Sequence, residues 1–62
     1  NILLLGSGGR ESAFAMKLAE SKDCEKLLIA PGNAGTVAFG TNVNIAVNDF
    51  EAIKTLCIAE DI

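Results

Sequence analysis

The sequence has no long apolar run. Nothing in it approaches the roughly 20 apolar residues that a membrane-spanning helix requires. The opening run, residues 2–5, is too short for the apolar core of a secretory signal and continues directly into a glycine loop. We therefore expect neither a membrane partner nor secretion.

Positive charge is scarce. The chain has 5 Lys and Arg residues against 8 Asp and Glu residues, which gives a net charge of −3. The basic residues are spread along the chain with acidic residues between them, so they form no stripe that could neutralise a phosphate backbone. This pattern argues against nucleic acid as a partner.

Cysteine is also rare. Cys24 and Cys57 are the only two cysteines, and they have neither metal-ligand spacing nor the density of a disulfide scaffold. We expect two free thiols, no metal site within these residues and a cytoplasmic protein.

Apolar residues make up half of the chain, which excludes a disordered segment. The runs 1–5 and 26–30 have the continuous apolar character of strands buried on both faces. Between them, residues 10–21 are rich in helix formers and present a broad apolar face. A short third strand is predicted over Val43–Val47.

A second helix is predicted after this third strand. Asn48 or Asp49 caps it, and Asn48 with Glu51 three residues later has the form of a capping box. The apolar stripe of this helix consists of Phe50, Ile53, Leu56 and Cys57. Asp61–Ile62 is expected to begin a fourth strand.

The order strand, helix, strand, loop, strand, helix predicts an α/β fold with a parallel, Rossmann-like sheet, flanking helices and right-handed crossovers. A chain of 62 residues buries only about 60% of the surface that its unfolded form exposes. Two helices also cover both faces of three strands poorly. We therefore expect residues 1–62 to be one incomplete, N-terminal domain of a longer protein; the alternative is a small domain that is complete by itself.

A glycine-rich loop, residues 6–11, lies between the first strand and the first helix. Glycine permits φ > 0 and lets a ligand approach the main chain closely. The start of the following helix offers unpaired N–H groups and the positive end of the helix dipole, which together form a natural seat for phosphate. The loop predicts a phosphate-bearing ligand, although a turn that only packs strand against helix has the same pattern.

A dinucleotide fits this loop poorly. The dinucleotide fingerprint requires glycine or alanine at its last position, where this chain has Glu11. It also requires an acidic residue at the end of the second strand, where the chain has Ala30, Pro31 and Gly32. An NAD-binding Rossmann domain of an oxidoreductase remains an alternative.

A second loop, residues 31–36, follows the second strand. Ligands of open α/β sheets bind beyond the carboxyl ends of the strands, so the two loops can face one ligand together. Asn33 offers amide donors and an acceptor, Thr36 a hydroxyl, and Gly32 and Gly35 offer N–H groups. This set suits a phosphorylated sugar, although a tight turn would have the same composition.

The two loops, in this order and at this separation, resemble the opening of the phosphoribosylamine–glycine ligase family. The resemblance covers essentially all 62 residues, including the third strand and the capped helix. The family commonly has histidine after the pair Arg10–Glu11, whereas this chain has Ser12. Ser12 could not replace that histidine as a base, but serine is compatible with the first turn of a helix.

The resemblance implies a pre-ATP-grasp domain at the start of an ATP-grasp ligase. Enzymes of this family join glycine to 5-phosphoribosylamine in purine biosynthesis, through a glycyl phosphate that the sugar amine attacks. They use ATP and Mg²⁺ (or Mn²⁺), and by resemblance both bind in the remaining domains of the same chain. The fragment is expected to hold no catalytic residue and to be inactive alone.

The contribution implied for residues 1–62 is to bind phosphoribosylamine, with Arg10 or Glu11 orienting the substrate or bracing the loops against each other. A plain surface role for this pair is the alternative, because neighbouring residues on a helix point in different directions. The substrate-binding residues expected on this basis are Gly6, Ser7, Gly8, Gly9, Arg10, Glu11, Pro31, Gly32, Asn33, Ala34, Gly35 and Thr36. Another ATP-grasp enzyme would share the first loop but lack the second. A non-catalytic binding module would be a complete protein of 62 residues.

Overall fold

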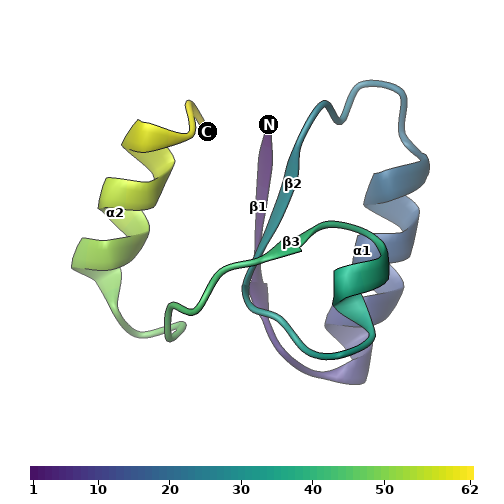
Figure 1. Ribbon diagram of the computed structural model, residues 1–62, viewed down its shortest axis with the longest axis horizontal. Helices are drawn as coiled ribbons and strands as arrows, with labels where there is room; N and C mark the ends of the chain where they lie inside the picture. Colours follow the sequence, from purple (N-terminus) through teal and green to yellow (C-terminus); the bar gives the residue numbers. More distant parts are fainter.

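Three parallel strands form one sheet in the computed structural model, which describes residues 1–62. The elements in chain order are β1 (Ile2–Gly6), α1 (Gly9–Glu20), β2 (Leu27–Pro31), the short 3-10 helix η1 (Thr36–Ala38), β3 (Thr41–Asn42) and α2 (Phe50–Ala59). The strands stand between α1 on the right and α2 on the left in Figure 1. The predicted α/β class and the predicted order of elements are confirmed.

The central strand β2 pairs with β1 on one side and with β3 on the other. The register of β1 and β2 runs from Ile2 opposite Leu27 to Gly6 opposite Pro31, so the two strands end at the same level. Parallel strands that end together bring the loops that follow them to one edge of the sheet. This register is what places the two glycine loops side by side.

The core lies between α1 and one face of the sheet. Ala15 of α1 packs with Leu27 and Ile29 of β2, and all three are buried. Leu28 and Ala30 alternate with them along β2, point to the opposite face and are buried too. The central strand is therefore covered on both faces, as its continuous apolar run predicted.

The third strand does not lie where the sequence predicted it. We expected Val43–Val47, but β3 consists of Thr41 and Asn42, and the last bond of its ladder runs from the N–H of Val43 to the oxygen of Ile29 at 2.8 Å. Gly40 permits this close approach, because a Cβ there would lie 2.6 Å from the carbonyl oxygen of Leu27. The apolar residues after Val43 leave the sheet and turn toward α2 instead.

The predicted apolar stripe of α2 is only partly buried. We expected Phe50, Ile53, Leu56 and Cys57 to form one buried stripe, but Phe50 is 75% exposed and the other three are half-buried.

The start and the end of α2 are both defined by local hydrogen bonds. Asp49 is the N-cap, and its carboxylate accepts from the N–H of Ala52 at 3.2 Å, so the capping box predicted between Asn48 and Glu51 is wrong. Asp61–Ile62 is not the start of a strand. Asp61 has φ 57°, and the N–H of Ile62 donates back to the oxygen of Cys57 at 2.9 Å, a turn typical of helix ends.

The far end of α2 is held to the amino edge of the sheet by polar contacts. The ammonium of Lys26 lies 2.6 Å from the carboxylate of Glu60, and the side-chain amide of Asn1 donates to the carbonyl oxygen of Glu60 at 2.7 Å. Both contacts are partly exposed, so each contributes little to stability. Neither α1 nor α2 has the length and apolar character that a passage through a bilayer would demand.

Candidate functional site

The two glycine loops leave adjacent strands at the carboxyl edge of the sheet, which is the lower edge in Figure 1. One backbone bond continues the ladder beyond the strands, because the N–H of Gly32 donates to the oxygen of Gly6 at 3.0 Å. The side-by-side placement predicted from the sequence is confirmed. The same bond shows that the N–H of Gly32, which we expected to be free, is already used.

The side-chain amide of Asn33 joins the second loop to the first. Its nitrogen donates to the carbonyl oxygens of Ser7 at 2.7 Å and of Gly8 at 3.1 Å. Its oxygen accepts from the hydroxyl of Ser12, in the first turn of α1, at 3.2 Å. These are polar contacts between segments more than twenty residues apart, and they join the two loops directly.

The same amide oxygen organises the second loop internally. It accepts from the N–H groups of Gly35 at 2.7 Å and Thr36 at 3.0 Å, so the N–H of Gly35 is not free either. The hydroxyl of Thr36 accepts from the N–H of Asn33 at 2.8 Å and lies 2.7 Å from the side-chain oxygen of Asn42. Thr36 is fully buried. In the sequence analysis its hydroxyl was a candidate ligand, but the structure uses it to hold the loop.

Glu11 folds back over the first loop. Its carboxylate accepts from the N–H of Gly8 at 3.0 Å, which is one half of a capping box at the start of α1. Gly6 has φ 138°, and a Cβ there would overlap the side chain of Glu11. Glu11 was predicted to orient the substrate or to brace the two loops against each other. In the structure its hydrogen bond lies within its own loop, and the orienting role stays a prediction.

The donors that remain unpaired lie at the start of α1. The N–H groups of Ser7, Gly9 and Arg10 donate no hydrogen bond within the chain, and the guanidinium of Arg10 makes no ion pair. In the second loop, the N–H of Ala34 is likewise unpaired and exposed. The N–H groups of Ser7, Gly9 and Arg10 lie at the positive end of the helix dipole, so an anion is the ligand that they suit best.

The twelve predicted residues therefore fall into two groups. One group presents unpaired N–H donors at the surface and consists of Ser7, Gly9, Arg10 and Ala34. The other residues shape the loops, and their polar groups are hydrogen-bonded within the chain. Pro31 ends β2, and Gly32, with φ 74°, packs so closely against the side chain of Asn42 that no other residue fits. Which of them touch a substrate stays a prediction.

Two residues of this network were missed from the sequence. Asn42 donates from its amide to the backbone oxygen of Asn33 at 2.8 Å, and Ser12 bonds the side chain of the same residue. The one signal for Asn42 was a polar residue next to the predicted third strand. Ser12 was noted in the sequence only because the family commonly has histidine at this position.

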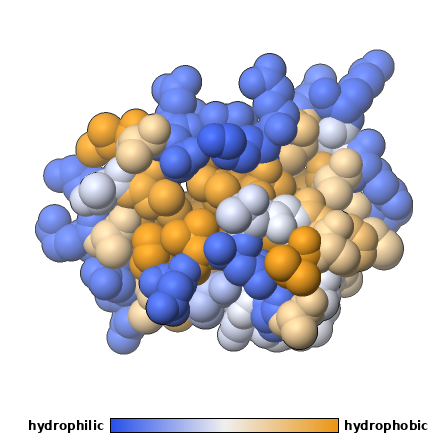
Figure 2. Space-filling view, viewed as in Figure 1, coloured by the Kyte–Doolittle hydropathy of each residue, from blue (hydrophilic) through white to orange (hydrophobic).

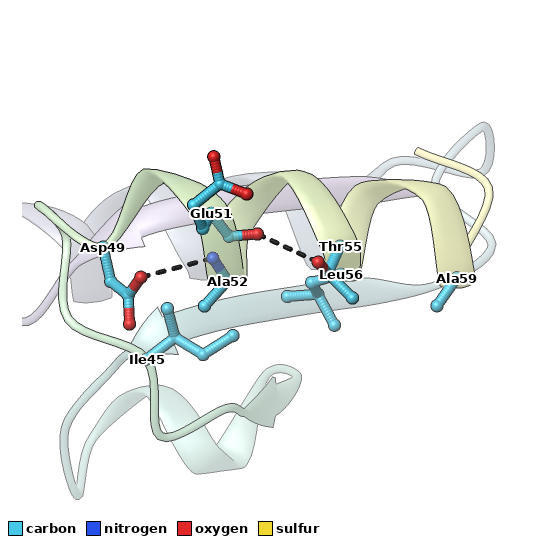
Figure 3. Close-up of a pocket in the computed structure, with 7 residues that line it drawn as sticks. All are labelled: Ile45, Asp49, Glu51, Ala52, Thr55, Leu56 and Ala59. Carbon is cyan, nitrogen blue, oxygen red and sulfur yellow. Dashed lines mark hydrogen bonds between the residues drawn. The ribbon is translucent and has the colours of Figure 1, made fainter.

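An apolar hollow lies elsewhere on the molecule. It has a volume of about 570 Å³ and lies between α2 and the segment that leads into it (Figure 3), lined by Ile45, Asp49, Glu51, Ala52, Thr55, Leu56 and Ala59. Figure 2 shows apolar side chains exposed across this part of the surface, between α2 and the sheet. The carboxylates of Asp49 and Glu51, which line it, would repel phosphate. The hydroxyl of Thr55 already donates to the backbone oxygen of Glu51. The hollow does not suit a sugar phosphate.

The family model described as "Phosphoribosylglycinamide synthetase, N domain" matches residues 1–62. The chain belongs to this family. The match covers both loops and every element of the sheet, so residues 1–62 are an N domain of this family.

Individual relatives agree with the family. The N domain is 43% identical over 60 residues to the phosphoribosylamine–glycine ligase of Pasteurella multocida, which covers 97% of this chain and 14% of that protein. It is 49% identical over 55 residues to the enzyme of the same name from Haemophilus influenzae, covering 86% of this chain and 13% of the relative. It is 43% identical over 58 residues to the human trifunctional purine biosynthetic protein adenosine-3, covering 90% of this chain and 6% of that protein. The chain thus spans a small fraction of the length of these relatives.

Proposed function

We propose that residues 1–62 form the part of a phosphoribosylamine–glycine ligase that receives the phosphoribosyl group of its substrate. The family and the names of the relatives support the enzyme and its place in purine biosynthesis. The observation that carries the substrate role is the pair of glycine loops joined at one sheet edge, with unpaired N–H groups at the start of α1. The rest of the protein supplies the other substrates' sites.

In this proposal the phosphate lies against the N–H groups of Gly9 and Arg10, where the helix dipole favours an anion. The guanidinium of Arg10 is exposed and unpaired, so it can add a charge-assisted hydrogen bond. The hydroxyl of Ser7 and the N–H of Ala34 lie on the two loops and can bind the ribose hydroxyls. Their role is to bind and orient the sugar so that its amine faces the acyl donor.

The chemistry is assigned to the remainder of the protein. The complete enzyme joins glycine to 5-phosphoribosylamine and forms glycinamide ribonucleotide. Residues outside 1–62 would hold ATP with Mg²⁺ or Mn²⁺, which would supply the phosphoryl group that activates glycine as a glycyl phosphate. The isolated 62-residue piece is accordingly expected to show no ligase activity, and turnover by the piece alone would overturn this division of roles.

Gly9→Val in the full-length enzyme tests the substrate role. A Cβ at Gly9 meets no atom within 4 Å, so an added side chain projects into open space and leaves the fold intact. If phosphate lies against this amide, the side chain blocks it, and the KM for phosphoribosylamine rises by about tenfold or more. The KM values for ATP and glycine should stay within about twofold of the unsubstituted enzyme.

Ala19→Val is the matched control. Ala19 is exposed near the far end of the same helix, so the substitution changes volume and helix propensity without approaching the loops. It should leave all three KM values unchanged. A phosphoribosylamine KM that is the same in both variants would show that the loop is structural and would refute the proposed site.

A further inference from the structure

We infer that Asn33 is a positioning residue: its side-chain amide orients the first glycine loop for the phosphoribosyl group and does not itself contact the substrate. The inference rests on the proposed function and refines it, since the sequence alone had placed Asn33 among the groups that bind the substrate. It follows from the hydrogen bonds that the Asn33 amide makes and from the geometry of the two peptide units whose carbonyl oxygens it binds.

The amide of Asn33 has no capacity left for a ligand. An amide side chain offers two N–H donors and an oxygen with two lone pairs. Both donors are taken by the carbonyl oxygens of Ser7 and Gly8, at 2.7 and 3.1 Å. The oxygen already accepts from Ser12, Gly35 and Thr36. A substrate atom could reach this side chain only by displacing a bond that holds the loops together.

Holding these two carbonyls determines where the neighbouring N–H groups point. The peptide bonds of this loop are trans, so the C=O and N–H of each unit point in opposite directions. With the oxygens of Ser7 and Gly8 held toward the second loop, the N–H groups of Gly8 and Gly9 are directed away from it. The first meets the carboxylate of Glu11 at 3.0 Å, and the second remains unpaired.

Asn33 thus contributes to the orientation of both peptide units. It is the one partner of the carbonyl oxygen of Ser7, at 2.7 Å, whereas the carbonyl oxygen of Gly8 also accepts from the N–H groups of Glu11 at 3.1 Å and Ser12 at 3.2 Å. Without these bonds, the unit between Ser7 and Gly8 is restrained only by the contact of its N–H with Glu11. Gly8 lacks a side chain that would restrict rotation of this unit. A loop free to rotate would present its donors in several directions, and its affinity for the sugar phosphate would fall.

Asn33→Asp separates this role from the internal structure of the second loop. The carboxylate can still accept from Ser12, Gly35 and Thr36, so the turn itself is retained. It has no N–H to donate, and its second oxygen would face the carbonyl oxygens of Ser7 and Gly8, which repel it. The substitution therefore breaks the bonds between the loops and little else.

The test is made in the full-length enzyme, with Asn48→Asp as the matched control. Asn48 is exposed in the turn before α2 and makes no hydrogen bond, so the control adds the same charge away from the loops. For Asn33→Asp we expect a rise of about tenfold or more in the KM for phosphoribosylamine, with the KM for ATP within about twofold. Ser12→Ala, which removes one bond and keeps both amide donors, is expected to raise it only about two- to threefold.

Hydrogen exchange in the absence of substrate supplies a second measurement. Asn33→Asp should speed amide exchange in residues 6–12 and leave the peptides of β1 and β2 protected. A raised KM with unchanged exchange in residues 6–12 would mean that Asn33 contacts the substrate, and the inference would be wrong. Exchange that increases across the whole sheet would indicate a merely structural role and would also overturn it.

The outcomes separate this inference from the proposed function. If the unsubstituted enzyme is an active ligase and Asn33→Asp behaves like Asn48→Asp, the positioning role falls while the proposed function stands. If the unsubstituted full-length protein does not form glycinamide ribonucleotide, the proposed function falls and takes the inference with it. Should Asn33→Asp fail to fold, Asn33→Ser decides. Its hydroxyl can replace the amide oxygen as the acceptor of the turn but is too short to reach the carbonyls of Ser7 and Gly8, so an unchanged KM in that variant contradicts the role given to the link.

Discussion

The side chain of Glu11 lies directly on Gly6, and its carboxylate accepts a hydrogen bond from the N–H of Gly8. The first glycine of the loop is thus required by the packing of an acidic residue five positions later, as well as by its own φ of 138°. The loop is a folded unit before any ligand arrives, since it is closed on itself by Glu11 and joined to its neighbour by Asn33.

Gly6→Ala should destabilise the N domain. The substitution places a Cβ inside the Glu11 side chain and forces a non-glycine residue into a backbone region that costs on the order of 1–3 kcal/mol. We expect the midpoint of urea unfolding to fall and exchange in residues 6–12 to rise. Gly9→Ala is the control, because its Cβ meets open space, and it should be neutral. Equal stability of the two variants would contradict the packing described for Glu11.

Thr36→Val should also destabilise the domain, although it keeps the shape of the side chain. The hydroxyl is fully buried and serves both the N–H of Asn33 and the side chain of Asn42, so its removal leaves buried polar groups unpaired at a cost of about 1–3 kcal/mol. Thr41→Val is the matched control on the exposed edge strand, with an expected change within about 0.5 kcal/mol. Urea unfolding of both variants checks this, and a larger loss from the control would refute it.

Asp49→Ala should weaken the start of α2 by about 1 kcal/mol, because its carboxylate accepts the otherwise unpaired N–H of Ala52. Asn48→Ala, one residue earlier, should change stability by no more than about 0.5 kcal/mol, since Asn48 makes no capping bond. Hydrogen exchange of residues 49–55 is the appropriate local measurement. If Asn48→Ala opened the helix more than Asp49→Ala, the assignment of the cap would be wrong.

Most of the fold followed from patterns a few residues long. The apolar runs of β1 and β2 and the helix formers of α1 predicted these elements to within one or two residues. The third strand was misplaced, because Val43–Val47 has the composition of a strand but the register with β2 is set by Gly40 and the side chain of Asn42. The fourth strand expected at Asp61–Ile62 is instead the closing turn of α2.

Local pattern was sufficient for the layers, the parallel order and the edge at which the two loops emerge, because burial and helix propensity act over neighbouring residues. It was also sufficient for the family, whose model matches residues 1–62. Only the tertiary structure determines which polar groups are hydrogen-bonded within the chain and which remain unpaired. Three partners of the Asn33 side chain, Ser7, Gly8 and Ser12, lie 21 to 26 residues away. Hydrogen-bond pairing between such segments depends on strand register and loop conformation, which no short stretch of sequence specifies.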